Sequence, residues 1–327
     1  MSQFIAILLI ALLILILLPG LLAPIEALLW WKTAKDEQKH QEALRLRAQP
    51  KLLFQLPAEV EHYIVYLSGI ADMSGEDLNY REAAFLERLD VRLPTTVVVS
   101  DVFPYSPSNR ELTGQRSLAW LWRRVARNRE LKKAGLSDLL VRLRNLLQVL
   151  VSADNRYGPI FNLGTAEEIM LGLLRHGYQP ATGKPVTIIG ISGGGQIAVG
   201  ALTYLSKMLT APLRVIALAG VISDDPGINF VQQLYLLQGT RDPAPNLGAI
   251  FYPGRWPFIS GSDWNKAKAA GKISRVVVGP MKHNGTGGYL DANSYLSNGQ
   301  SYLDKVVDIM VDIIKEAGVS KTLEATK

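Results

Sequence analysis

Ser192 lies within a glycine-rich segment, VTIIGISGGGQIA, which begins at Val186 as an apolar run. Glycine loses more backbone freedom on folding than any other residue, so three glycines directly after a serine indicate a turn that requires them. Gly190, Ser192 and Gly194 have the spacing G-x-S-x-G, with an apolar strand before the serine and a helical pattern from about Gly195. Small residues on both sides of the serine let the strand and the helix approach each other. The segment therefore predicts a nucleophilic serine whose hydroxyl is presented above a sheet.

A serine hydroxyl needs a base that takes its proton, and the base needs a third group that orients it. Of the four histidines, His283 follows the last apolar strand pattern, within RVVVGPMKHNGTGGYLD. Loops at this end of a parallel sheet are where ligands and catalytic groups collect. The other three have ordinary explanations: His40 lies in a polar connector, His62 precedes the first strand, and His176 ends a helix. His283 is therefore the candidate base, with a surface histidine of no function as the alternative.

Asp242 is the candidate for the orienting acid. It follows the end of a predicted strand at Gln238 by four residues, one strand before the segment that carries His283. Two rival acids, Asp224 and Asp225, follow the strand before that one. A third possibility is that Asp242 serves only as a turn former before a proline.

These three segments resemble the α/β-hydrolase superfamily, and the resemblance covers about residues 60–316. In that family a G-x-x-D turn at the end of the preceding strand supplies the acid, and Gly239-Thr240-Arg241-Asp242 matches it. A histidine ahead of the final helix serves as the base, as His283 would. The order Ser192, Asp242, His283 along the chain is the family's order. The resemblance implies acyl transfer to water by a Ser-His-Asp triad that needs no metal and no organic cofactor.

The resemblance also implies an oxyanion hole made of two backbone N–H groups. One is the N–H of Gly193, and the other comes from the loop after the first strand, where Ser68-Gly69-Ile70 occupies the matching position. Ile70 is the expected donor, and Gly69 is the alternative donor and the residue expected to provide room. The chain departs from many relatives here, because it lacks their His-Gly-Gly-Gly or His-Gly form.

The glycine-rich segment also admits other interpretations. Gly193 to Ala198 fits G-x-G-x-x-A, a dinucleotide-binding pattern typical of a nucleotide-dependent oxidoreductase. That pattern requires an acidic residue about 20 positions further on and a place in the first βα unit, and the chain has neither. A phosphate-binding loop is excluded because no Lys-Ser/Thr pair follows the glycines. A turn made only for close packing of a helix on a strand remains open.

Hydrophobic periodicity predicts the elements that position these residues. Apolar runs alternate with helical patterns, and several runs are apolar throughout, as is typical of strands covered on both faces. This order predicts an α/β fold with a doubly wound, mostly parallel sheet. The predicted strands span residues 63–68, 96–101, 186–191, 214–219, 232–238 and 275–279. The predicted helices span about 76–90, 165–177, 195–209 and 299–316.

A helical insertion at about 107–155 interrupts this alternation. Leucines, tryptophans and valines recur there at helical spacing, and residues 110–144 carry ten Lys and Arg against three Asp and Glu. We expect two amphipathic helices with basic outer faces. They form either a hairpin packed on the main core or a cap or membrane-docking element over the active site.

The N-terminal region predicts a membrane anchor over residues 1–31. Phe4 to Leu18 is uninterrupted apolar sequence, and no charged residue precedes Glu26. A cleaved signal peptide is disfavoured because no Lys or Arg precedes the apolar run, and a kinked or re-entrant segment remains the alternative. A basic helical connector is expected over 32–58, with six Lys and Arg against three acids in 32–51. Positive charge beside the anchor predicts a single-pass protein whose domain of residues 59–327 lies on the cytoplasmic side.

Composition narrows the function further. The chain has 327 residues and no cysteine, which excludes disulfides, thiolate metal sites and cysteine nucleophiles. The net charge of +6 is concentrated in the connector and the insertion, beside the anchor, so it favours anionic lipid as partner and not nucleic acid. The leading hypothesis is a membrane-anchored serine hydrolase, esterase-like or lipase-like, acting on an amphiphilic ester or acyl lipid. The alternative is a catalytically silent α/β-hydrolase-like scaffold in a membrane complex.

Overall fold

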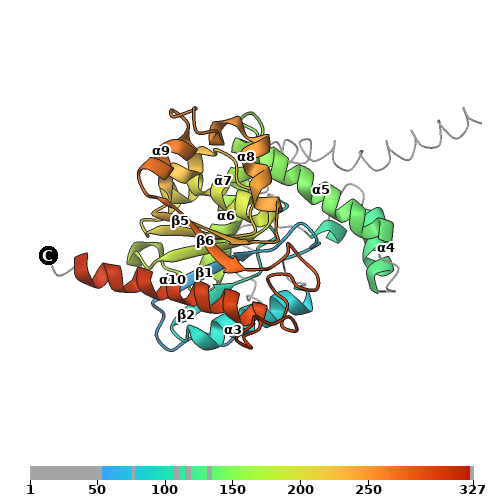
Figure 1. Cartoon of the computed structure of the whole chain (residues 1–327), viewed down its shortest axis with the longest axis horizontal. Coiled ribbons are helices and arrows are strands. Elements are labelled where there is room, and N and C mark those ends of the chain that lie inside the picture. The colour runs from blue at the N-terminus through green and yellow to red at the C-terminus, as the bar shows by residue number, and fades with distance from the viewer. Residues whose placement is uncertain (1–53, 76–77, 107–110, 115–118, 131–134, 325–327) are drawn as a thin grey trace, which may run out of the picture.

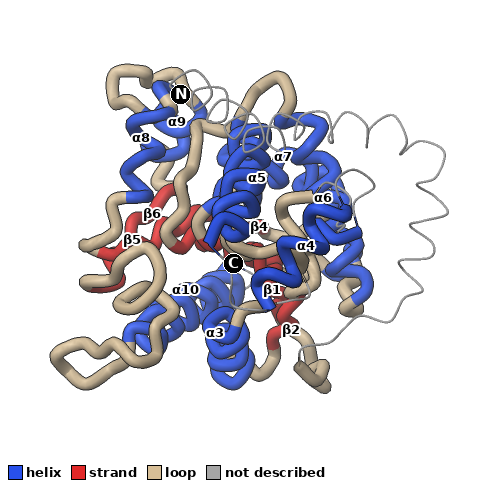
Figure 2. Tube along the Cα trace, turned by 90° about the vertical axis from the view of Figure 1, so that its right-hand side faces the viewer, coloured by secondary structure: helices blue, strands red, loops and turns tan. Residues whose placement is uncertain are grey.

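The computed structural model describes residues 54–75, 78–106, 111–114, 119–130 and 135–324, and in them helices cover both faces of one sheet (Figures 1 and 2). The sheet has six strands, all paired in parallel in the order β2-β1-β3-β4-β5-β6. The strands are β1 (His62–Leu67), β2 (Thr96–Val99), β3 (Val186–Ile191), β4 (Leu213–Leu218), β5 (Gln233–Gly239) and β6 (Ile273–Gly279). The α/β class and the parallel sheet are therefore as predicted, and every strand boundary lies within two residues of its predicted position.

The strand order reverses between β1 and β3. From β1 the chain adds β2 on one side, then crosses back to add β3, β4, β5 and β6 on the other. The loops that leave β1 and β3 therefore diverge at the carboxyl ends of the strands, and ligands of open parallel sheets typically bind at such a point. The segment after β3 holds Ser192 and the segment after β1 holds Ile70, so the topology brings the nucleophile turn and the predicted oxyanion loop together.

Two apolar cores explain why the strands carry few polar residues. Alternate residues of β1 point into different cores: Tyr63 and Val65 into one, and Ile64 and Tyr66 into the other. One core is closed by α6 (Gly158–Arg175), α7 (Gly193–Met208) and α9 (Asp263–Ala269). The other is closed by α3 (Tyr80–Arg92) and α10 (Tyr302–Glu324). Figure 2 shows these two groups of helices on opposite sides of the sheet.

The helices depart further from prediction than the strands do. Helix α6 begins seven residues before its predicted start, at Gly158-Pro159, and most of its residues are buried. A helix covered on nearly all sides has no polar face, so the periodicity that marks a surface helix is weak there. The short helix α8 (Leu247–Phe251), helix α9 and several single turns were not predicted. The 3-10 turns are η1 (Leu112–Gly114), η2 (Pro180–Thr182), η3 (Pro226–Phe230), η4 (Ala244–Asn246) and η5 (Pro253–Arg255).

The insertion contains the predicted pair of helices, α4 (Ala119–Glu130) and α5 (Gly135–Ala153). They enclose a third apolar core together with residues from α6 and α7. Trp122 belongs to this core and is 1% exposed, and Arg144, one of the basic residues of the insertion, is buried at 2% exposed. Trp122 therefore cannot contact a membrane, because it faces the same side of α4 as the buried Val125. Trp120 is 64% exposed, on the outer side of α4.

The predicted membrane anchor and most of the connector lie outside the described residues. Within the described ranges, none of the helices combines the length and apolar character that crossing a bilayer requires. The last residues of the expected helical connector, 54–58, are described and form a bend and coil. Pro57 explains this difference, since proline disfavours the helical conformation in the residue before it.

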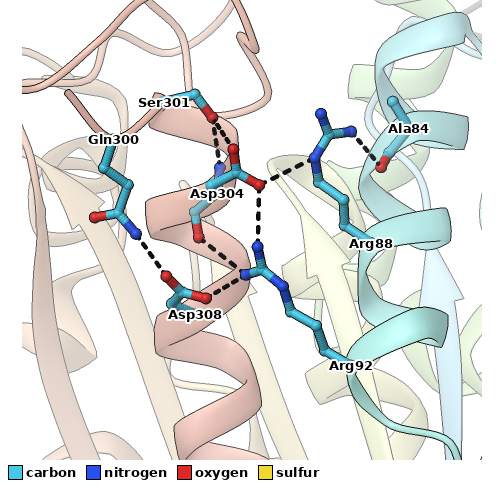
Figure 3. A network of polar contacts seen from close by, with 7 residues as sticks. All are labelled: Ala84, Arg88, Arg92, Gln300, Ser301, Asp304 and Asp308. Atoms are coloured by element: carbon cyan, nitrogen blue, oxygen red, sulfur yellow. Dashed lines mark hydrogen bonds and ion pairs between the residues drawn. The ribbon is translucent and has the colours of Figure 1, made fainter.

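Helices α3 and α10 are joined by a cluster of charged residues beside the second core (Figure 3). The Asp304 carboxylate accepts hydrogen bonds from Arg88 Nε and Arg92 Nη2, both at 3.1 Å. Arg92 also pairs with Asp308, and the Ser301 hydroxyl bonds to Asp304 Oδ2 at 2.5 Å. The hydrogen bond from Ser301 and the two guanidinium groups lower the pKa of Asp304 below its usual value.

Replacing Asp304 by asparagine tests this cluster. Because these side chains are about one-third exposed, solvent screening limits the expected loss in free energy of unfolding to about 1 kcal/mol at neutral pH. Because the pKa of Asp304 is lowered, its full contribution to stability is present above about pH 4. The contribution is lost as the pH falls through the pKa of Asp304 in the folded state. Urea unfolding of the wild type and Asp304→Asn should therefore differ at pH 7 and converge near pH 2. An equal difference at both pH values would contradict the assignment.

Candidate active site

Ser192 occupies a strained turn between β3 and α7. Its backbone angles are φ 52° and ψ −117°, in the region that favours glycine and costs other residues about 1–3 kcal/mol. The Ser192 N–H donates to the carbonyl of Leu218 at 2.9 Å, which ties the turn to the end of β4. The turn therefore has the sharp geometry that the glycine spacing predicted.

The glycines on either side of Ser192 are required by close backbone contacts. A Cβ on Gly190 would lie 2.6 Å from the backbone of Gly194, and a Cβ on Gly194 would lie 2.6 Å from the carbonyl oxygen of Leu67. Both distances are shorter than real Cβ atoms show, and backbone cannot move aside as a flexible side chain does. The turn therefore packs closely against the start of its own helix on one side and against the end of β1 on the other.

The structure brings the three predicted catalytic residues into one chain of contacts. Ser192 Oγ lies 3.0 Å from His283 Nε2, and His283 Nδ1 lies 3.0 Å from Asp242 Oδ2. The three residues come from the loops after β3, β6 and β5, and 91 positions separate the serine from the histidine. This is the nucleophile–base–acid geometry that activates a hydroxyl group.

Asp242 is an ionised acceptor at the buried end of this chain. Its side chain is fully buried, and burial alone would raise its pKa. Hydrogen bonds from His283, from the hydroxyl of Tyr289 and from the N–H of Ala244 favour the charged form, and together they hold the pKa of Asp242 below its usual value. The acid is therefore charged at neutral pH and orients the imidazole.

An ionised carboxylate accepts hydrogen bonds and cannot donate them. His283 Nδ1 must therefore carry the proton that it shares with Asp242, so in the neutral ring Nε2 carries the lone pair. That lone pair faces Ser192 Oγ. The tautomer assigned from the hydrogen bonds is the one that allows His283 to remove the serine proton.

The loops after β5 and β6 are held together by further contacts. The Thr240 N–H donates to the carbonyl of Gly279 at 2.8 Å, and a Cβ on Gly239 would lie 2.3 Å from the carbonyl oxygen of Met281. Lys282 N–H donates to the carbonyl of Gly287 at 2.8 Å, which closes a tight loop around His283. The relative position of the acid and the base is thus fixed by backbone as well as by side chains.

Sequence reasoning missed Tyr289, which also holds Asp242. Its hydroxyl donates to Asp242 Oδ2 at 2.7 Å and accepts from the Gly239 N–H at 2.8 Å. It is 3% exposed, and burial is the main cause that raises the pKa of Tyr289. Asp291, also missed, accepts from the Gly287 N–H at 2.7 Å and so braces the histidine loop. The only signal in the sequence was the position of both residues just after His283.

The predicted oxyanion loop lies beside the nucleophile turn. A Cβ on Gly193 would lie 2.7 Å from the Ile70 side chain, so the loop after β1 reaches the first residue of α7. The expectation that Gly69 provides room for a substrate stays a prediction. Within 4 Å, a Cβ on Gly69 would meet only Ile191, at an ordinary 3.8 Å.

The rival residues have other partners. His62 Nε2 bonds to Thr187 Oγ1 at 2.9 Å, and His176 Nδ1 bonds to the carbonyl of Gly172 at 2.9 Å. Asp225 accepts from the Gly227 N–H at 2.8 Å and from Gln196, and its burial raises the pKa of Asp225 to about 6. Asp224 packs against Gly254. His40 lies outside the described residues.

A scan of the chain against models of known protein families finds no match, and a comparison with curated proteins finds no significant relative. Among the described residues, no group of three or more His, Asp and Glu is placed to hold a metal ion. The function must therefore be inferred from the contacts of Ser192, His283 and Asp242.

The strain at Ser192 predicts an unusual effect of glycine on stability. Ser192→Gly should unfold with a free energy about 1 kcal/mol higher than Ser192→Ala, because glycine adopts these backbone angles freely. Ser206, inside the same helix α7, is the matched control, and there glycine should be about 1 kcal/mol less stable than alanine. Urea denaturation of the four variants measures both differences. The same sign at both positions would show that Ser192 is not strained.

Proposed function

We propose that this protein is a serine hydrolase that cleaves an ester or acyl-lipid-like substrate through an acyl-enzyme. The observation that carries the proposal is the chain of two 3.0 Å contacts from Ser192 Oγ through His283 to the buried carboxylate of Asp242. A polar serine held at a strained backbone position, with a base and an ionised acid behind it, has no evident role in stability.

In the proposed reaction, Ser192 Oγ attacks the carbonyl carbon of the ester while His283 Nε2 takes the serine proton. The carbonyl π electrons move to oxygen and form a tetrahedral oxyanion. When that oxyanion collapses, the bond to the leaving alcohol breaks and His283 gives its proton to the alcohol oxygen. Water then attacks the acyl-serine with His283 again as the base, and this step releases the carboxylic acid and restores Ser192.

The surroundings of Ser192 suit the charges that develop in these steps. The N–H of Gly193 is in the first turn of α7, where backbone N–H groups have no acceptor within the helix. Together with the Ile70 N–H it forms the proposed oxyanion hole. Asp242 stabilises the imidazolium that forms when His283 takes the proton. Each oxyanion donor in such a site typically contributes about 3 kcal/mol to lowering the barrier.

The proposal includes an α/β-hydrolase type of fold. The nucleophile follows a central strand, the acid follows β5 and the base follows β6, and this order of Ser, Asp and His is that of the superfamily. The parallel sheet, with helices on both faces and an insertion after β2, is compatible with that assignment.

We also propose that the protein is held on the cytoplasmic side of a membrane by residues 1–31 and that its substrate is amphiphilic. The exposed side of α4 carries Trp120, Arg123, Arg124 and Arg127, spaced as one helical face. The exposed side of α5 carries Leu139, Arg142, Leu146 and Leu150 at the same kind of spacing. Apolar side chains mixed with arginines suit the boundary between anionic headgroups and acyl chains.

Labelling with a fluorophosphonate probe tests the proposed nucleophile. The detergent-solubilised wild type should form one covalent adduct on Ser192, and Ser192→Ala should form none. His283→Ala should react at least about a thousandfold more slowly, because the hydroxyl then keeps its proton. Ser206→Ala, a serine variant on the same helix, should react like the wild type.

Absence of labelling in a folded wild type would contradict the proposed function and favour the catalytically silent scaffold. Labelling of Ser192→Ala at the wild-type rate would show that another residue is the nucleophile. Circular dichroism of each variant establishes that it is folded.

The absence of cysteine allows a direct test of the membrane-facing surface. A single cysteine in place of Leu146, labelled with an environment-sensitive fluorophore, should report an apolar environment when the full chain is reconstituted into vesicles containing phosphatidylglycerol. The response should be weaker with phosphatidylcholine alone, because the arginines then lack anionic partners.

Val91→Cys is the control for this experiment. Val91 is 74% exposed and lies on α3, across the sheet from α5, so its label should stay in water in both kinds of vesicle (Figure 2). Equal, aqueous signals from the labels at 91 and 146 would show that the insertion does not contact lipid.

A further inference from the structure

Helix α5 of the insertion is hydrogen-bonded directly to the loop that follows β1. The side-chain amide of Asn145, which is fully buried, donates to the carbonyl of Ile70 at 3.0 Å and to the carbonyl of Asp72 at 2.8 Å. The same loop forms a turn in which the Asp72 N–H donates to the carbonyl of Gly69 at 3.3 Å. Asn145 therefore holds two carbonyl groups of the turn that carries the proposed oxyanion donor.

The orientation of the Asn145 amide is fixed by its neighbour. Arg144 Nη1 donates to Asn145 Oδ1 at 3.1 Å, and to the carbonyl of Tyr105. A guanidinium group can only donate, so the amide oxygen must face Arg144 and the NH₂ group must face the loop. In a flipped amide the NH₂ group would face the Arg144 donor, and the amide oxygen would face the two carbonyl acceptors of the loop. The buried Arg144, which the sequence placed on a basic outer face, thus orients Asn145.

A second contact holds the other side of the same turn. The Tyr105 hydroxyl, also buried, donates to the carbonyl of Ser68 at 2.8 Å. Peptide groups are planar, so fixing the carbonyls of Ser68 and Ile70 fixes the peptide planes on either side of the one that carries the Ile70 N–H. The peptide plane that carries the Ile70 N–H then has little freedom to rotate.

We propose that Asn145 is a positioning residue that sets the direction of the oxyanion-hole N–H in the loop after β1, an inference that rests on the proposed function. This role makes the helical insertion part of the proposed catalytic site. The outer side of α5 would face the membrane, and its inner side would hold the loop after β1. Arg144 and Tyr105 act with Asn145 in holding the loop.

Asn145→Leu tests this role, because leucine has a similar volume but leaves the carbonyls of Ile70 and Asp72 without a donor. With a p-nitrophenyl ester as probe, kcat should fall about 10- to 100-fold, since a misdirected donor weakens transition-state binding. KM should change by less than about threefold, because the ground-state carbonyl needs the donor less. The affinity for an alkyl boronic acid, whose adduct with Ser192 places an anionic oxygen in the hole, should fall by about the same factor as kcat.

Ser152→Ala is the matched control on the same helix. Ser152 is also buried, and its hydroxyl donates to Asn162 Oδ1 at 2.7 Å, away from the loop. This variant should lose stability and keep the wild-type kcat and boronate affinity. Wild-type kcat and boronate affinity in folded Asn145→Leu, or an equal loss of both in Ser152→Ala, would overturn the proposal.

Tyr105→Phe keeps the inference testable if Asn145→Leu does not fold. It removes one oxygen atom and the bond to Ser68 while keeping the aromatic ring, and it should lower kcat and boronate affinity together by about tenfold. Unchanged values would overturn the proposal. A wild type that resembles Ser192→Ala in every assay would instead overturn the proposed function, so the two failures are distinguishable.

Discussion

The strained backbone at Ser192 determines where the nucleophile lies relative to the loops around it. A non-glycine residue at φ 52° and ψ −117° persists only where its surroundings leave no alternative. Here Gly190 and Gly194 pack against backbone on both sides with no room for a Cβ, and the serine N–H is bonded to β4. This backbone conformation directs the Ser192 hydroxyl away from the helix that follows and toward His283. A relaxed turn would be more stable and would lose that contact.

The site also requires the parallel sheet, because the sheet places the carboxyl ends of β1, β3, β5 and β6 at one edge. Residues far apart in the chain can meet there only if each loop is held in a defined position. Three kinds of contact do this: backbone bonds between the loops after β5 and β6, the Tyr289 hydroxyl on Asp242, and the Asn145 amide on the loop after β1. Each uses a buried polar group that is satisfied only when its loop is in place, so the site and the fold stabilise each other.

The sequence predicts the strands and the three central residues well, for identifiable reasons. The strands are buried on both faces, so they appear as short apolar runs, and parallel pairing then puts Ser192, Asp242 and His283 at the same edge. The residues whose roles the sequence does not predict are placed by contacts between elements that are distant in the chain. Tyr289 and Asn145 carry no local pattern, and Arg144 lies on a helix whose buried side packs on a third apolar core. Helix α6 was placed too late because a helix buried on most sides lacks the periodicity of a surface helix.

Combining substitutions of Ser192 and His283 shows whether the two side chains act as one unit. Residues that act together lose their whole contribution when either is removed, so their effects on the rate do not multiply. The turnover number for ester hydrolysis should be measured for Ser192→Ala, for His283→Ala and for the double variant. We expect the double variant to be no slower than the slower single variant. Losses that multiply in the double variant would show that the 3.0 Å contact between these side chains is not a catalytic one.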